Sequence, residues 1–188
     1  MKESLTCSSG IQAIGGARVM NCFELPDIIE LNEYRGNFSL FLEAIYNVFK
    51  KDFVTSKPSF KGVRLGLKKF PLVEGKEYTF YHMTHKGDIE NERIPDFRRM
   101  ERIAWPRPMI DNSGDECLKV WRNIRRGNGG TKNRILILHE TERYLVVLDD
   151  RGDYILPWTA FLIEGNRQLQ KYLKEYEAYR TAEAAKKT

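Results

Sequence analysis

Histidine and arginine side chains are concentrated in one short span of the sequence. Residues 79–108, TFYHMTHKGDIENERIPDFRRMERIAWPRP, contain two histidines, five arginines and a tryptophan. Histidine titrates near neutral pH and can act as a general acid or a general base. Arginine offers phosphate oxygens a permanently charged fork. Together these residue types are the inventory of a metal-independent ribonuclease, in which the RNA 2′-hydroxyl attacks its own phosphate.

The charge distribution also favours an anionic partner. The chain has a net charge of +5 and a pI of about 9.0, which is typical of proteins that bind nucleic acid. Seven bases and one acid lie between Lys50 and Lys69, and five bases and no acid lie between Arg122 and Arg134. Either run alone is typical of a solvated face. Two such runs, together with the arginines of residues 79–108, favour RNA as the partner.

Several other chemistries have no support in the sequence. The chain lacks the GxxxxGK[ST], GxGxxG, HExxH and GxSxG motifs of nucleotide-binding proteins, zinc proteases and hydrolases. Cys7, Cys22 and Cys117 have no CxxC or Cys/His spacing, so neither a zinc site nor a disulfide framework is expected. We therefore expect no metal and no cofactor. The sequence has no membrane-spanning apolar run, and we expect a cytoplasmic location with no membrane contact.

The length and the element pattern indicate one domain. Residues 1–19 are expected to form a disordered tail, and Met20 is a hypothetical translation start. Residues 20–188 are expected to form a single α+β domain. Apolar periodicity and turn residues predict a helix over 38–53, a strand at 63–68 and a strand at 78–85 that carries both histidines. A short helix at 96–104, which WPRP stops, and a helix from Ser113 or Asp115 to the GNGG segment are expected next. The chain is then expected to form a three-stranded meander over 134–164, with Pro157 at an edge or bulge, and a helix over 166–185.

The order of the short motifs carries a resemblance. FYHMT, then ERIPDFRRMERIAW, then YLVVLDDRGDYILPWTAF resembles the phage-associated branch of the barnase, EndoU, colicin and RelE-like nuclease superfamily, over residues 60–165. The resemblance implies helices packed on a small four-stranded antiparallel sheet, with a histidine on the first strand. It also implies an RNA-cleaving toxin or phage-conflict effector, and an antitoxin or immunity protein as a candidate partner.

Candidate site residues follow from that resemblance and from the basic runs. His82 is expected as the general acid or base, and Arg99 and Arg102 as contacts to the scissile phosphate. Thr159 is expected to hydrogen-bond a phosphate oxygen or the ribose, and His85 is the candidate for a second catalytic histidine. On a strand, histidines three residues apart would point to opposite faces. The candidates for phosphate or RNA binding are Arg93, Arg98, Arg102, Arg125, Arg126, Lys68 and Trp158.

Three alternatives stay open. A non-catalytic RNA-binding or regulatory module would explain the basic runs and the aromatics without chemistry. An ADP-ribosyltransferase is less well supported, because YHMTH resembles a strand-end histidine motif of that fold but its catalytic glutamate has no counterpart. The helical arginines could instead pair with Asp96 and Glu101 across helix turns, and His139 is expected to be a surface or hydrogen-bonded residue.

Overall fold

The computed structural model describes residues 23–87, 89–127 and 130–186, with side chains described except at residues 91 and 125–130. The predicted tail over residues 1–19 and the start at Met20 lie outside these ranges. The helices are η1 (Leu31–Tyr34), α1 (Phe38–Phe49), η2 (Lys50–Thr55), α2 (Tyr78–Thr84), η3 (Glu90–Glu92), α3 (Phe97–Glu101), α4 (Pro106–Asp111) and α5 (Asn166–Ala185). The strands are β1 (Ser59–Phe60), β2 (Val63–Arg64), β3 (His85–Lys86), β4 (Ile94–Pro95), β5 (Leu118–Gly127), β6 (Gly130–His139), β7 (Tyr144–Asp150) and β8 (Ile155–Leu162).

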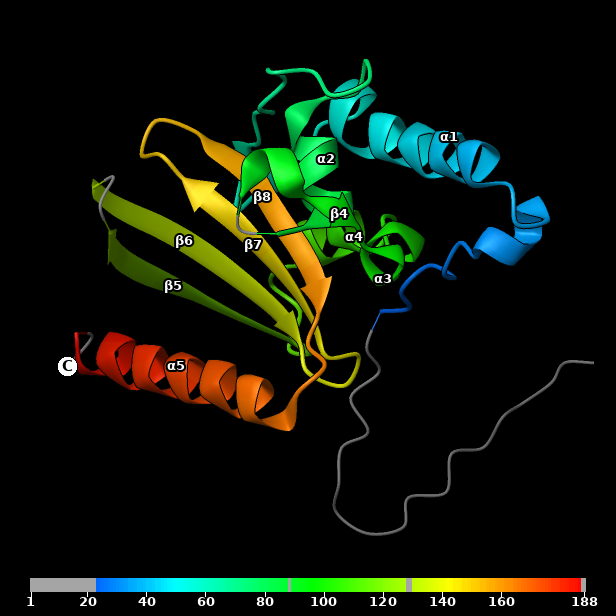
Figure 1. Ribbon diagram of the computed structural model, residues 1–188. Helices are drawn as coiled ribbons and strands as arrows, with labels where there is room; N and C mark the ends of the chain where they lie inside the picture. Colours follow the sequence, from blue (N-terminus) through cyan, green and yellow to red (C-terminus); the bar gives the residue numbers. More distant parts are fainter. Residues whose placement is uncertain (1–22, 88, 128–129, 187–188) are drawn as a thin grey trace, which may run out of the picture.

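The main sheet is four-stranded and antiparallel, with the order β5-β6-β7-β8 (Figure 1). Two short two-stranded pairs, β1-β2 and β3-β4, lie outside it in the described part of the chain. The predicted α+β class and the four-stranded antiparallel sheet are therefore confirmed. No described helix is both long and apolar enough to cross a membrane.

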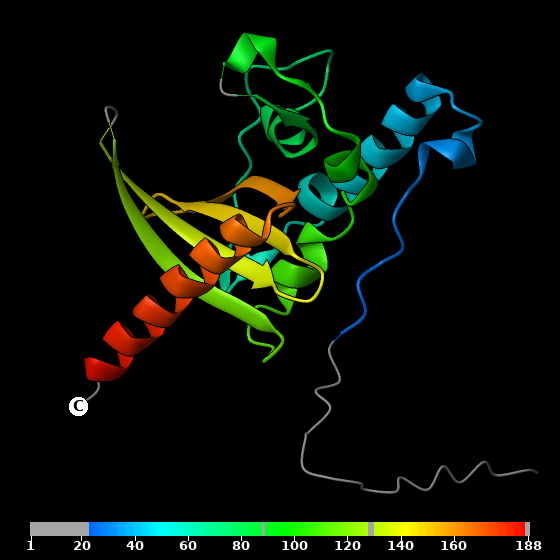
Figure 2. The same ribbon diagram turned by 60° about the horizontal axis from the view of Figure 1, so that its bottom comes forward.

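The two faces of the main sheet are covered differently. One face packs against α1 to α4, and its core includes Phe41, Ile45 and Phe49 of α1, all fully buried. These residues recur at helical spacing, and the Asn37 side chain caps the helix by accepting from the backbone N–H of Leu40. Among the described elements, α5 is the helix that packs on the opposite face, and it lies across β5 (Figures 1 and 2).

The register places one row of side chains across that opposite face. Trp121 of β5, Leu136 of β6, Val147 of β7 and Thr159 of β8 occupy neighbouring positions. The register shifts between Val147 and Leu148, opposite the segment that contains Pro157, and β8 is the edge strand. The prediction that Pro157 lies at an edge or bulge is confirmed, since proline cannot donate to a strand ladder.

Residues 78–84 are helical, so the strand predicted at 78–85 is wrong. Aromatic residues and threonine favour a strand, but tertiary packing overrides that preference here. The segment Tyr78–Thr84 is α2, which buries six of its residues, Tyr78, Thr79, Phe80, His82, Met83 and Thr84. The histidines are consequently not on opposite faces of a strand. His82 lies within the helix, and His85 begins β3.

The predicted helix before GNGG is also wrong, because Leu118–Gly127 is β5 and supplies the fourth strand. Its pairing with β6 leaves Ile124 exposed, whereas helical spacing had placed that residue inward. Pro106 does not stop the preceding segment but begins α4, at a position where its missing N–H costs nothing. Cys117 is disulfide-bonded, whereas the cysteine spacing predicted no disulfide framework.

The remaining elements follow the sequence pattern. The helix predicted over 38–53 is α1 continued by η2, and the helix predicted over 166–185 is α5. The strand predicted at 63–68 is shorter, since β2 covers only Val63–Arg64. Trp105 and Trp121 are buried core residues.

Candidate functional site

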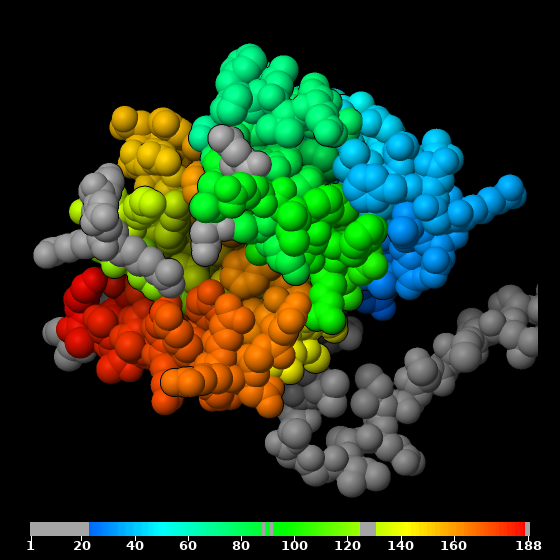
Figure 3. All heavy atoms as spheres, viewed as in Figure 1, coloured from blue at the N-terminus to red at the C-terminus, as the bar shows by residue number. Residues whose placement is uncertain are grey.

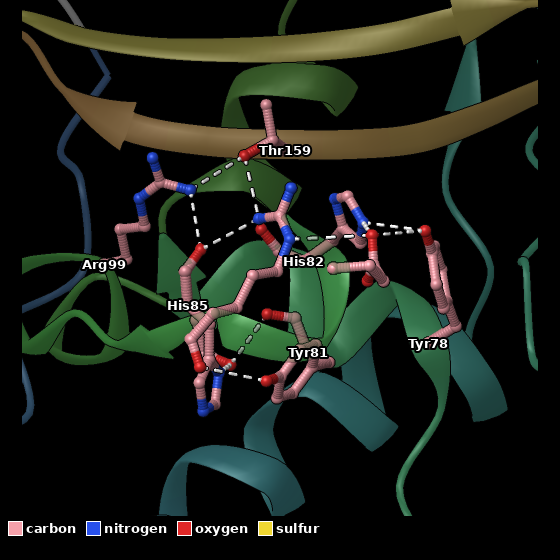
Figure 4. A network of polar contacts seen from close by, with 9 residues as sticks. Tyr78, Tyr81, His82, His85, Arg99 and Thr159 are labelled. Carbon is pink, nitrogen blue, oxygen red and sulfur yellow. Dashed lines mark hydrogen bonds and ion pairs between the residues drawn. The ribbon is translucent and has the colours of Figure 1, made fainter. Parts of the chain in front are cut away.

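His82 of α2 lies beside β8, the edge strand of the main sheet, and is 3% exposed. Its Nε2 is 2.9 Å from the Tyr78 hydroxyl and 3.0 Å from Oε2 of Glu90 (Figure 4). The Tyr78 hydroxyl also donates to Glu90 Oε2, at 3.0 Å. An ionised carboxylate only accepts hydrogen bonds, so neutral His82 carries its proton on Nε2.

Burial controls the electrostatics of this cluster. It lowers the pKa of His82 below the ordinary histidine value, and the contact with Glu90 opposes that shift only in part. Burial raises the pKa of Tyr78 to about 12, and Glu90 adds to the increase. For Glu90, burial acts to raise the pKa, but the hydrogen bonds from His82 and Tyr78 outweigh it and lower the pKa. At neutral pH the cluster therefore holds one carboxylate and two neutral donors.

Thr159 and Arg99 join the edge strand to α2 and β3. The Thr159 hydroxyl donates to the backbone carbonyl of His82 at 3.3 Å, and Arg99 Nη1 donates to Thr159 Oγ1 at 3.2 Å. Arg99 Nη1 also donates to the backbone carbonyl of His85 at 3.0 Å. Figure 4 shows these residues converging from β8, α3 and α2. Burial lowers the pKa of Arg99, and the nearby Asp96 opposes the shift.

His85 faces a different cavity. Its ring stacks on Tyr81 with centroids 4.1 Å apart, and Nδ1 lies 2.9 Å from the Thr84 hydroxyl. Burial lowers its pKa. His85 and Arg93 line a cavity of about 280 Å³ that also includes Tyr81 and Pro95. His82 is not among the residues that line this cavity.

A pocket of about 310 Å³ lies on the sheet face that α5 only partly covers, and we call it the sheet pocket. Its wall is formed by Lys132, Arg134, Trp158, Thr159, Phe161 and Tyr172, over a floor of Leu136 and Val147. Figure 3 shows this face, where sheet atoms are visible between α5 below and the segment with α2 and α3 above.

The Arg134 guanidinium lies 4.3 Å from the centroid of the Trp158 ring and 2.7 Å from Asp149, which also pairs with Arg151. The Trp158 ring also lies 4.9 Å from the His82 ring. One tryptophan thus contacts both the sheet pocket and the buried histidine.

A second hollow of about 210 Å³, the basic cleft, adjoins the sheet pocket at Phe161. Its lining includes Lys86, Arg98 and Arg99, with Asp96 and Glu164 as their acidic partners. Arg98 pairs with Glu164 at 2.8 Å across the surface, and not with a carboxylate of its own helix. The two hollows share Phe161 as a lining residue, and in both the lining cations outnumber the carboxylates that contact them.

The other predicted residues lie apart from this surface. Arg102 pairs at 3.1 Å with Glu101, its neighbour in sequence, and lies 5.1 Å from the centroid of the Trp105 ring. The pairing across a helix turn that the alternative predicts is found instead between Arg99 and Asp96, at 3.5 Å. The Lys68 ammonium lies 3.4 Å from the centroid of the Tyr78 ring, on the His82 side of the site. Arg125 and Arg126 pair in register with Lys132 and Thr131, but their side chains lie outside the described part of the chain.

Sequence reasoning missed Arg134, Phe161, Tyr78 and Glu90 as site residues. Arg134 could have been found, because it shares its strand face with Leu136 and Leu138 and therefore breaks an apolar row. Glu90 gives no such signal, since its contact with His82 depends on a turn and not on a periodic pattern.

The described residues contain no group of three or more histidine, cysteine, aspartate or glutamate side chains placed to hold a metal ion. Comparison of the chain with protein-family models, curated proteins and solved structures finds no match.

Proposed function

We propose that this protein binds single-stranded RNA across the sheet pocket and the basic cleft, and cleaves it without a metal ion. The observation that carries the proposal is that Arg99 and the Thr159 hydroxyl meet beside the backbone of His82, at the border of a basic, aromatic-lined pocket.

Binding is supported by the composition of the surface. Lys132, Arg98 and Lys86 offer charges to successive phosphates, and such contacts supply most of the affinity for nucleic acid. Phe161 and the Arg134 guanidinium, itself stacked on Trp158, offer flat surfaces to unstacked bases. The Thr159 hydroxyl donates its one hydrogen to the His82 carbonyl, and its remaining lone pair can accept from a ribose 2′-hydroxyl. This combination favours single-stranded RNA over a duplex.

Cleavage would follow the transesterification route. The 2′-oxygen forms a bond to phosphorus while a base removes its proton, and the bond to the 5′-oxygen breaks as an acid returns a proton to it. The products are a 2′,3′-cyclic phosphate and a 5′-hydroxyl. His82, with its lowered pKa, is neutral at pH 7 and suits the role of base. Arg99 would stabilise the charge that develops on the phosphorane.

RNA binding without cleavage is the second candidate, and the 3% exposure of His82 favours it. A base must come within hydrogen-bond reach of the proton that it removes. Glu90 lies against the imidazole Nε2 and accepts its proton in a hydrogen bond, so a substrate has to displace that carboxylate, and the proton has to move to Nδ1, before Nε2 can act as a base.

One experiment separates the two candidates. The full chain is incubated with a fluorescein-labelled single-stranded RNA in EDTA, and binding is read by anisotropy and cleavage on a denaturing gel. We expect binding, products that end in a cyclic phosphate, and a rate that falls about 10²–10⁴-fold in His82→Ala. His139→Ala is the matched control, because His139 is also buried, at 5% exposed, and lies at the end of β6 that pairs with Tyr144, two strands away from Thr159 of β8. Binding with no cleavage by the unaltered protein would leave only the second candidate, and absence of binding would remove both.

A further inference from the structure

Glu90 occupies a ring of donors that is built for an anion. Its Oε2 accepts from Tyr78 and His82, and Arg93 Nε lies 3.6 Å from the same oxygen. We call this ring of three donors the Glu90 anion site. The His82 and Arg93 side chains are 4% and 14% exposed, whereas the Glu90 side chain is 42% exposed. The donors are therefore fixed inside the protein, and the acceptor comes from its surface.

The carboxylate fills this ring incompletely. Tyr78 and His82 hydrogen-bond a single oxygen of Glu90, which Arg93 Nε approaches only to 3.6 Å. The other oxygen, Glu90 Oε1, is buried and has no hydrogen-bond partner among the described residues. Arg93 Nε is likewise buried without a hydrogen bond in that part of the chain. Leaving a buried polar atom unpaired is costly. A tetrahedral anion with more oxygens would satisfy donors that a planar carboxylate leaves unpaired.

The charge around the site suits a phosphate. Without the Glu90 carboxylate, the Arg93 guanidinium and the Lys68 ammonium over Tyr78 would leave the site with excess positive charge. Arginine and lysine are both ordinary phosphate ligands. Trp158 links this place to the sheet pocket, because its ring contacts both His82 and Arg134.

We propose that the Glu90 anion site is a phosphate-binding site that Glu90 occupies as an internal stand-in. A phosphate enters when the Glu90 side chain rotates toward solvent, and it takes the hydrogen bonds of Tyr78 and His82. The assignment of this phosphate to an RNA backbone rests on the proposed function, but phosphate binding itself does not. When a phosphate replaces the Glu90 carboxylate, His82 Nε2 contacts a phosphate oxygen. While Glu90 occupies the site, Nε2 cannot make this contact.

The test measures phosphate binding directly. The imidazole resonances of His82 are followed by NMR at pH 7 while inorganic phosphate is added to the unaltered protein, Glu90→Ala, Glu90→Gln and Glu92→Ala. Glu92 is exposed and lies on the same short helix, so Glu92→Ala removes the same charge without opening the site. We expect Glu90→Ala to bind phosphate about tenfold more tightly than the unaltered protein, since a competing charged acceptor has been removed. Glu90→Gln should lie between the two, and Glu92→Ala should match the unaltered protein.

Two outcomes would overturn the proposal. One is an unchanged phosphate affinity in a Glu90→Ala protein that still unfolds cooperatively. The other is an equal gain in Glu92→Ala, which would reflect net charge alone. A nucleoside 3′-monophosphate serves as a second probe, and tighter binding than inorganic phosphate assigns the site to a nucleotide. If phosphate binds in Glu90→Ala but no variant binds or cleaves RNA, the anion site stands and the proposed function fails.

Discussion

The two faces of the main sheet use the same strands for different purposes. On the face that α1 to α4 cover, Ile137, Val146 and Ala160 lie in a continuous apolar core. On the other face α5 covers the β5 side, where Trp121 packs against Tyr172 and Tyr176, and the β8 side keeps Arg134, Asp149 and Thr159. Because side chains alternate along a strand, a single set of strands can support a core on one face and a polar pocket on the other.

Substitution of one aromatic residue on each face gives the sharpest contrast. Phe49→Ala on the covered face should lower the free energy of unfolding by about 3–5 kcal/mol, because the ring is fully buried between Phe53 and Phe80. Phe161→Ala on the open face should cost about 1 kcal/mol and weaken RNA binding. Urea unfolding and RNA anisotropy measure the two effects. Equal losses of stability would show that the open face is also part of the core.

Buried and exposed ion pairs on the sheet should also differ in how much they contribute to the free energy of unfolding. In Arg134→Met, the almost fully buried Asp149 keeps only Arg151 as an ion-pair partner among the described side chains, so the protein should lose about 3 kcal/mol of unfolding free energy. Arg122→Met is the matched control on the same sheet. Its pair with Asp150 leaves the Arg122 side chain 52% exposed, and such pairs contribute about 0–1 kcal/mol. A loss in Arg122→Met as large as that in Arg134→Met would contradict this distinction.

The buried histidines His82 and His85 should make the free energy of unfolding depend on pH. Burial lowers the pKa of both His82 and His85, so the unfolded chain binds protons more readily than the folded one. Stability should fall as the pH drops below about 6.5, the unfolded value, and level off below the lowered folded pKa. For each such histidine the slope reaches at most about 1.4 kcal/mol per pH unit. Urea unfolding at pH 7.5 and 5.5 measures it, and a His82→Asn/His85→Asn protein with the same slope would refute the assignment.

The smallest expected effect is the change in RNA affinity when one exposed charge, that of Lys132, is removed. Lys132→Ala should weaken RNA binding several-fold and reduce the slope of log affinity against log salt by about 0.7, because one phosphate contact is lost. Lys57→Ala removes the same charge from an exposed residue that follows η2. If both variants change the salt slope equally, RNA binding is not localised to the open face.

The sequence predicted the elements whose pattern is strong. Strands β6, β7 and β8 alternate or run apolar between clear turns, and α1 and α5 repeat at helical spacing. The errors fall on Tyr78–Thr84 and Leu118–Gly127, where local preference and tertiary packing disagree. In the second segment, the spacing of Leu118, Trp121 and Ile124 suits a helix, but pairing with β6 decides the structure.

Site residues could be predicted only where their chemistry is visible in the chain. Arg99 and Thr159 were expected near a histidine, and they contact the backbones of His82 and His85. The partner of the His82 ring could not be predicted. Glu90 reaches it through a turn, and a turn leaves no periodic signal in the sequence.

The hydrogen bond between Thr159 and His82 has a consequence for the order of folding. Each strand of the main sheet pairs with its neighbour in sequence, so the sheet can form by the successive pairing of short hairpins. The contact between Thr159 and His82, by contrast, closes a separation of 77 residues, and such long closures come with a larger entropy cost. During synthesis, the histidine therefore emerges well before the strand that completes its surroundings. A nascent chain that ends before Thr159 has no assembled site.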